Sequence, residues 1–180
     1  MSENCPSYNC QSITTHLLND CENEFQGGSD QIVLLLCGHT VTDPSNGTQI
    51  NSNISNGKAV LIRNVKFGLD APSPIEIESN ISCRGPKVVT YDRTAPMIDS
   101  NVNSNNVTMY NQLLNGYTIA GIIFFECSAN RVTWIDDLIR ATGGRIMPNE
   151  DNEFQRFETV FKWRSKNEGQ IYPAPAGVFY

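Results

Sequence analysis

The chain has 180 residues, of which 39% are hydrophobic and 18% are charged, and its formal net charge is −6 at pH 7. This length suffices for one well-packed domain, and the low charge content excludes a chain kept unfolded by its own repulsion. The negative balance argues against a protein that grips nucleic acid through clustered basic side chains, since the 13 lysines and arginines are scattered along most of the chain.

The N-terminal region is polar and contains three of the six cysteines. We expect residues 1–29 to form a separate segment or arm, in which residues 12–23 make one short helix. The opening MSENCPSYNCQS lacks the basic and apolar stretches of a secretory signal, and no run approaches the roughly 18 apolar residues that span a bilayer. We therefore expect a protein made in a cytoplasm, where its cysteines stay reduced.

A single β domain is expected over residues 30–169. Six segments have the apolar runs or the alternation of strands: residues 31–37, 59–67, 75–81, 87–91, 117–127 and 154–163. Residues 38–58, between the first two strands, consist mostly of turn formers. We expect a long loop there, or an extended hairpin that uses the turn signal Asn46-Gly47.

Two further helices are expected between these strands. Residues 107–114 have one helical pattern, and residues 134–142 have another, with Thr133 as a candidate N-cap and Asp136-Asp137 in the first turn. Strands and helices do not alternate regularly. We therefore predict a mainly β fold with minor α content, an antiparallel β-sandwich or barrel with one or two short packed helices and long loops.

Potential metal ligands gather near the N-terminus: Cys5, Cys10, His16, Cys21, Cys37 and His39. Zinc prefers tetrahedral sites of Cys and His, but only Cys5-x4-Cys10 approaches the usual spacing of paired ligands. Cys37 ends an apolar strand, where a free cysteine behaves as a small hydrophobe. We favour free or buried cysteines and predict no metal and no cofactor, with zinc binding by the N-terminal cysteines as the open alternative.

Residues arranged for catalysis are not recognisable. Nucleophilic catalysis needs a Ser or Cys beside a His base, and only His16 and His39 are available, neither near a marked nucleophile. Asp136-Asp137 and the acidic run 150–153 offer paired carboxylates, but a helix N-terminus and a solvated loop explain them better. We therefore predict that the protein is not an enzyme and has no catalytic residues.

The C-terminal residues 170–180, QIYPAPAGVFY, are expected to form an extended arm. The aromatic side chains of Phe157, Phe161, Trp163 and Tyr172 are assigned to the core. Phe179 and Tyr180 instead close a Pro-Ala-Pro-Ala-Gly run, and two alternatives stay open for them. The arm either docks on a neighbouring subunit, by strand addition or by anchoring in a pocket, or folds onto its own domain.

Three segments carry a resemblance to a known family: NQLLNGYTIAGIIFFEC, TWIDDLIRATGG, and NEFQRFETVFKWRSK leading into IYPAPAGVF. In their texture and order, the stretch from about Tyr91 to Phe179 resembles structural proteins of tailed bacteriophages, including gut phages, of the tail-tube or head–tail connector-ring type. The resemblance implies a β-sandwich or barrel protomer that closes into a homo-oligomeric ring, commonly six-fold or twelve-fold, around a DNA channel. It carries over no catalytic residues.

The same resemblance implies where the protein works and with what. Its partners would be further copies of itself, neighbouring virion proteins, and DNA that passes through the lumen without specific binding, with no membrane anchor. Its place would be the virion, after synthesis in the cytoplasm of the bacterial host. An acidic surface is compatible with a channel through which DNA slides.

The leading hypothesis is therefore a virion structural protein that self-assembles into a ring or tube as part of the DNA conduit. We expect residues 38–58 and 170–180 to contact neighbouring subunits, and deletion of residues 170–180 to abolish assembly and leave the fold intact. The main alternative is a ligand-binding or adhesin-type β-sandwich. A small enzyme using His39 or Asp136-Asp137 is the third hypothesis.

Overall fold

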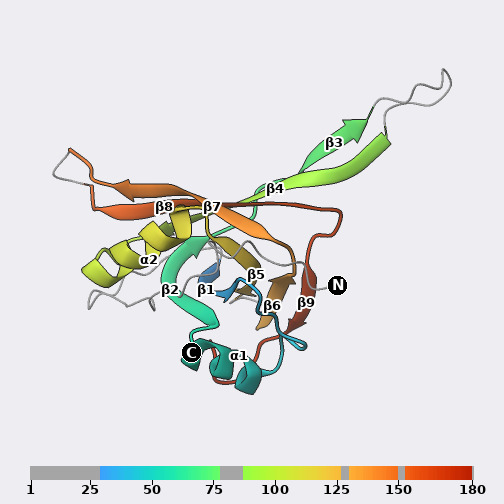
Figure 1. The fold of residues 1–180 in the computed structure, drawn as a ribbon, viewed down its shortest axis with the longest axis horizontal. Helices are drawn as coiled ribbons and strands as arrows, with labels where there is room; N and C mark the ends of the chain where they lie inside the picture. Colours follow the sequence, from blue (N-terminus) through green and yellow to red (C-terminus); the bar gives the residue numbers. More distant parts are fainter. Residues whose placement is uncertain (1–28, 78–86, 127–129, 150–152, 180) are drawn as a thin grey trace.

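The computed structural model of the chain describes residues 29–77, 87–126, 130–149 and 153–179. Its elements in these ranges are β1 (Ser29–Leu36), α1 (Gly47–Ser55), β2 (Ala59–Phe67), β3 (Ser73–Ile77), β4 (Lys87–Asp99), α2 (Ser104–Leu114), β5 (Thr118–Glu126), β6 (Arg131–Ile135), β7 (Ile139–Ile146), β8 (Arg156–Ser165) and β9 (Gln170–Pro173). The predicted mainly β fold with minor α content is confirmed (Figure 1).

The strands form one antiparallel sheet that closes on itself. Neighbouring strands follow the order β1-β2-β4-β8-β7-β5, and β5 then pairs again with β1, placing Ile32 opposite Phe124 and Leu34 opposite Ile122. Beyond this ring, β6 and β9 extend the sheet from β5, and β3 forms a hairpin with β4. The architecture is therefore a barrel, one of the two forms that the sequence predicts, with strands added outside it.

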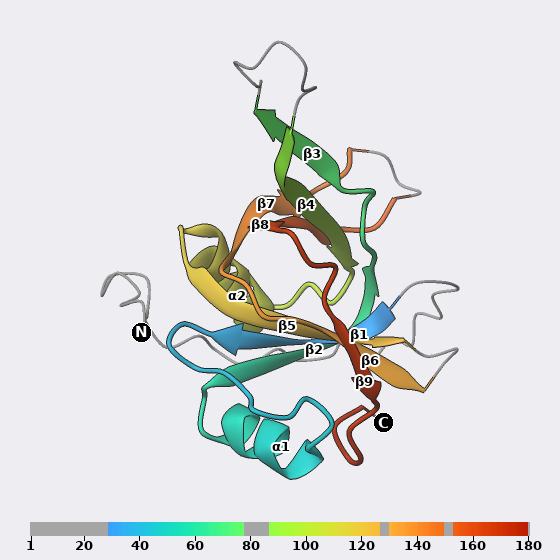
Figure 2. The ribbon, with the colours of Figure 1, turned by 90° about the vertical axis from the view of Figure 1, so that its right-hand side faces the viewer.

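The first hydrophobic core fills the barrel. Its fully buried side chains come from strands on opposite walls, for example Ile62 from β2, Ile122 from β5 and Phe161 from β8. Helix α2 lies at one side of the barrel between its two groups of strands (Figure 2). The ring of Tyr110 on α2 stacks on Phe157, with centroids 4.2 Å apart. One end of the barrel is thus closed by a helix.

The second core lies on the outer side of β1 and β5. Because successive strand residues point to opposite faces, Val33 and Ile123 face this core while their neighbours face the barrel. Helix α1 covers it with the buried Ile50, beneath the lower strands in Figure 2. Strands β1 and β5 are therefore buried on both faces, which explains their continuous apolar runs.

The helix predicted over residues 134–142 is wrong. The chain there forms β6 and β7, joined at residues 136–138, and β6 pairs with both β5 and β9. β-Branched residues such as Val132, Ile135 and Ile139 suit this paired state, and all three are buried. Tertiary pairing overrides the local capping signals, so Thr133 lies within a strand and caps no helix.

A helix replaces the loop or hairpin expected within residues 38–58. Asn46 ends the preceding turn as the N-cap of α1, where its side-chain oxygen accepts a hydrogen bond from the backbone N–H of Gln49 at 3.1 Å. Gly47 follows because a Cβ there would lie 2.1 Å from the carbonyl oxygen of Ala176. The Asn-Gly pair therefore starts a helix that touches the C-terminal tail.

The C-terminal tail packs on its own domain, which is one of the two alternatives left open by the sequence. Strand β9 pairs with β6, and Phe179 stacks on Phe125 with ring centroids 5.2 Å apart. Val178 and Phe179 are both buried in the second core. Residues 170–179 are therefore part of the domain rather than a separate arm, because they supply side chains that the core needs. Residues 1–28, with the predicted helix at 12–23, lie outside the described residues.

Two hairpins extend beyond the barrel at opposite ends (Figure 1). The hairpin of β3 and β4 carries Ile77 and Val88, which are 59% and 39% exposed. Strands β7 and β8 lead to the other end, where Met147 and Phe154 are 63% and 84% exposed. Large apolar side chains thus meet solvent at both extremities of the molecule.

Candidate functional site

A cavity of about 500 Å³ occupies the end of the barrel away from α2. Phe157 and Trp163 mark the two ends of β8, and whereas Phe157 lies under α2, Trp163 lines the cavity. Phe124 from β5 lines it as well, and apolar side chains come from Leu69 in the β2–β3 connection and from Ile171 in β9. The volume falls within the range of small-molecule and side-chain binding sites.

The indole of Trp163 gives the cavity wall an unusual feature. The side chain is 7% exposed, and its Nε1 is buried without a hydrogen-bond partner among the described residues. A buried N–H without an acceptor costs free energy. Trp163 therefore contributes an aromatic side chain to the wall, and its buried N–H has no acceptor among the described residues.

Three carboxylates and one guanidinium add charge to the cavity: Asp70, Glu126, Glu168 and Arg93. The carboxylate of Glu126 accepts hydrogen bonds from Thr133 Oγ1 at 2.5 Å and from Arg131 Nε at 2.6 Å. Burial opposes its ionisation, but these two partners outweigh burial and lower the pKa of Glu126 below its ordinary value. Glu126 is therefore ionised at neutral pH, and the cavity rim is acidic.

The guanidinium of Arg93 already contacts other groups of the same chain. Its Nε donates to the carbonyl oxygen of Ser165 at 3.3 Å, and its guanidinium lies 5.5 Å from the centre of the Tyr91 ring. Asp70 accepts a hydrogen bond from Thr94 Oγ1 at 2.7 Å, so it too has one partner. Arg93 and the Arg131 that is bonded to Glu126 stand against three carboxylates, so the cavity has a small excess of negative charge, which suits a cationic ligand group.

The carboxylate pair Asp136-Asp137 lies in the turn between β6 and β7, away from any helix N-terminus. Burial raises the pKa of Asp137, as does the neighbouring Asp136, although Ser165 and Arg93 partly offset this. Neither aspartate is among the residues that line the cavity. The predicted role of this pair at the start of a helix is wrong, because no helix forms there.

His39 follows the end of β1, and its backbone N–H donates to the carbonyl oxygen of Leu36 at 3.0 Å. Its imidazole makes no hydrogen bond or ion pair with another described residue, and no described histidine lines the cavity. His16 and residues 150–152 of the acidic run lie outside the described residues. The part of the chain that the structure describes therefore brings no histidine together with the cavity carboxylates.

Cys37 takes part in a disulfide bond, so the expectation that all six cysteines stay reduced is wrong for this one. Its side chain is buried at the end of β1, as the sequence predicts. A sulfur atom held in a disulfide is not a thiolate and does not bind zinc as one. Among the described residues, no three His, Cys, Asp or Glu side chains gather as metal ligands, while Cys5, Cys10 and Cys21 fall outside that part of the chain.

The sequence pattern did not reveal the cavity. It assigned Trp163 to the core, which is correct, but gave no role to Glu126, Glu168 or Arg93. One signal was available for Glu126, because a carboxylate directly after the apolar run IIFF is unusual at a strand end. Glu168 and Arg93 have no such signal, since only the closure of the barrel brings them together.

The chain matches no protein-family model, no curated protein and no solved structure. Among the described helices, neither α1 nor α2 is long and apolar enough to cross a bilayer.

Proposed function

We propose that this protein is a structural subunit that self-assembles into a ring or tube, of the kind that tailed bacteriophages build as a tail tube or head–tail connector. The proposal extends to a DNA conduit in the virion, with neighbouring virion proteins as further partners. It rests on the resemblance of residues 91–179 to such proteins and on one structural observation, described next.

The supporting observation is the pair of hairpins that project from opposite ends of the barrel (Figure 1). An isolated two-stranded hairpin is marginally stable in water, and exposed large apolar side chains mark interaction surfaces. Because the two ends differ in sequence, a contact that joins the end of one copy to another surface of the next is heterologous. Contacts of this type generate closed rings or open filaments.

We assign the contacts with neighbouring subunits to the two hairpins, rather than to residues 38–58 and 170–180 as first expected. Helix α1 in residues 38–58 and the tail in residues 170–179 place Ile50, Val178 and Phe179 inside their own protomer. Such buried side chains are not available as anchors for a neighbouring copy. Ile77 and Val88 at one end, with Met147 and Phe154 at the other, are the exposed candidates.

The test is the mass of the purified protein across a range of concentrations, by light scattering after size exclusion, with negative-stain images of the same fractions. We expect rings, tubes or a defined oligomer for the natural chain. Phe154→Ser is expected to weaken assembly at one end, and Ile77→Ser at the other, since each removes an exposed apolar contact.

Leu138→Ser is the matched control, because Leu138 is 53% exposed but lies in the β6–β7 turn, outside both hairpins. It is expected to assemble like the natural chain. All four proteins should melt at similar temperatures, because the substituted side chains are exposed. A natural chain that stays a 20.0 kDa monomer at every concentration would contradict self-assembly.

A ligand-binding β module is the second candidate, and the cavity beside Trp163 is the observation that favours it. In that case the natural chain would remain monomeric and bind a small cationic or hydroxyl-bearing ligand at the cavity. Titration with a panel of amines and saccharides, followed by the fluorescence of the tryptophans, tests this candidate. A monomer that binds none of them would contradict both candidates.

A further inference from the structure

Two basic side chains lie directly opposite each other on the outer wall of the barrel. Arg140 on β7 is in register with Lys162 on β8, and both are exposed. On its other side, Lys162 is in register with Thr94, which is uncharged. Like charges in register on adjacent strands repel, and neither residue forms an ion pair with a described residue.

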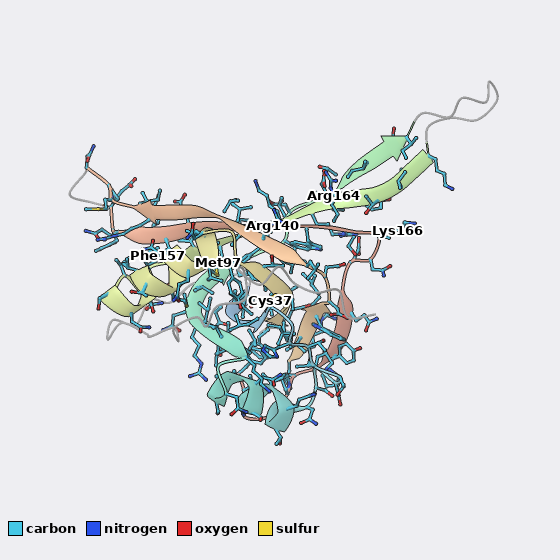
Figure 3. The ribbon with its side chains drawn as sticks, in the orientation of Figure 1. Cys37, Met97, Arg140, Phe157, Arg164 and Lys166 are labelled. Carbon is cyan, nitrogen blue, oxygen red and sulfur yellow. The ribbon has the colours of Figure 1, made fainter. Side chains whose placement is uncertain are left out.

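The surroundings do not neutralise this basic pair. The next outward residue of β8 is Arg164, whose Nε is 2.7 Å from Asp92 Oδ1, so that aspartate already has a partner. Figure 3 places Arg140 and Arg164 on the upper side of the view, away from α1. A chain with a net charge of −6 thus exposes two basic side chains in register on one wall, and the Asp70 carboxylate, bonded to Thr94, lies near Lys162 without forming an ion pair with it. Such a surface favours a negatively charged partner.

The cavity of the same protein has the complementary character. Its three carboxylates outnumber Arg93 and the Arg131 that is bonded to Glu126, and Trp163 and Phe124 supply aromatic surfaces. A lysine or arginine side chain beside an aromatic ring and an ionised carboxylate gains from both contacts. The aliphatic stem of such a side chain also suits the apolar wall provided by Leu69 and Ile171.

Among the described residues, Lys162 and Arg140 form no ion pair with a cavity carboxylate of their own copy. Lys162 and Trp163 are consecutive residues of β8, so their side chains point to opposite faces of the sheet. Trp163 faces the cavity and the first core, whereas Lys162 faces solvent. Trp163 and Lys162 therefore lie on opposite sides of one strand, although Thr94, in register with Lys162, and Asp70, bonded to Thr94, also line the cavity.

We infer that the barrel-end cavity of one copy receives Lys162 or Arg140 from the outer wall of a second copy. This inference rests on the proposed self-assembly and identifies a contact additional to the hairpins. A second copy is favoured over DNA as the acidic partner of the wall, because one pair of basic residues is far fewer than nucleic-acid binding needs and the remaining charge is negative. A tube requires contacts of more than one kind, and this one supplies a polar contact.

Charge reversal on each side tests the inference. Lys162→Glu and Glu168→Lys, each alone, are expected to weaken association by about tenfold or more, because each places like charges together. The chain with both changes is expected to regain most of the association, since the charges are exchanged and attract again. Association is measured by light scattering over a range of concentrations, and folding by thermal melting.

The matched controls are Lys58→Glu and Asp43→Lys, which make the same charge changes at exposed positions away from the wall, the cavity and both hairpins. They should associate like the natural chain. If Lys162→Glu and Glu168→Lys also do so, the inference is wrong while self-assembly stands. If the natural chain is itself a monomer, both the proposed function and this inference fail.

A second readout reports the cavity directly. In a Trp134→Phe chain, Trp163 is the remaining tryptophan, and its quenching by acrylamide measures access to the cavity. We expect quenching to fall on assembly and to stay high when Lys162 and Arg140 are both changed to Glu. Quenching that is the same in monomer and assembly would contradict filling of the cavity.

A second charge pair is available for the charge-reversal test. If Glu168→Lys lowers the melting temperature, Arg140→Glu and Asp70→Lys are used in its place.

Discussion

A buried carboxylate organises the junction between β4 and α2. Asp99 is fully buried, and its Oδ1 accepts hydrogen bonds from the backbone N–H of Asn101 at 2.8 Å and from Asn101 Nδ2 at 2.7 Å. Its Oδ2 accepts the hydroxyl of Tyr110 at 2.8 Å. Asn106, also buried, donates to the carbonyl oxygen of Asn101 at 2.7 Å. These contacts fix where α2 starts, and hence how it closes the barrel.

Tyr110→Phe tests the strength of this junction. It leaves Asp99 Oδ2 without its hydroxyl donor in a buried place, and we expect a loss of about 2 kcal/mol in the free energy of unfolding, measured by urea titration. Tyr91→Phe is the control, because Tyr91 is half-buried and its hydroxyl has no hydrogen bond with a described residue. Equal stability of the two variants would show that the hydroxyl of Tyr110 contributes nothing.

Alkaline pH should act on the same residue. Burial, and then the charge of Asp99, raise the pKa of Tyr110 well above its ordinary value near 10. The unfolded chain therefore loses this proton first as pH rises, and stability present below about pH 10 falls above it. We expect Tyr110→Phe to show a shallower loss of urea midpoint between pH 9 and about 11 than the natural chain. An identical slope would contradict this, although Tyr117, whose pKa burial also raises, adds to both curves.

Among the elements, the C-terminal tail is the one whose role differs most from expectation. Residues 170–179 pair through β9 and fill the second core, so their deletion is expected to unfold or strongly destabilise the protein rather than only prevent assembly. Phe179→Ala alone should cost about 3–5 kcal/mol, because it removes the ring that stacks on Phe125 and leaves a cavity.

Thermal melting distinguishes the two roles of the tail. A Phe179→Ala chain that melts like the natural protein and fails to assemble would indicate a tail that contacts a neighbour. Ile171→Ala is the control in the same segment, because Ile171 is 60% exposed on β9. We expect this variant to lose far less stability than Phe179→Ala.

The sequence predicted those elements whose patterns are local. Strands β1, β2, β5 and β8 and helix α2 lie where apolar runs, alternation or helical spacing placed them. It failed for β6 and β7, since WIDDLIR carries helical capping signals and only pairing with β5, β8 and β9 reveals a strand. It also failed for α1, because Gly47 and Ile50 are its two buried residues and only Ile50 has a large apolar side chain, so the many turn formers hide the helical pattern.

The candidate site was less predictable than the fold. Its carboxylates come from the β2–β3 connection, the end of β5 and the β8–β9 connection, positions that are far apart in the sequence. Single charged residues in loops have a solvated surface as their ordinary explanation, so no pattern distinguishes Asp70 or Glu168. The register of the closed barrel is the information that the sequence alone lacked.

At the scale of the whole molecule, the dependence of association on salt concentration distinguishes the two proposed contacts. Apolar contacts at the hairpins should persist in about 1 M NaCl, where the screening length is about 3 Å, while the wall-to-cavity contact should weaken. We therefore expect the association of the natural chain and of Glu168→Lys to converge at high salt, as measured by light scattering. A difference between them that is the same at low and high salt would contradict an electrostatic contact.

The pairing of β1 with β5 also governs how the protein reaches its folded state. Ile32 can pair with Phe124 only after most of the chain between them has folded. In the same way, β4 can pair with β8 only after the segments between these two strands have folded. Such non-local pairing makes folding slow, on the order of milliseconds to seconds. Until β5 arrives, the apolar run of β1 presents an open strand edge to other chains. Production of soluble protein should therefore depend on slow synthesis and on chaperones that shield β1.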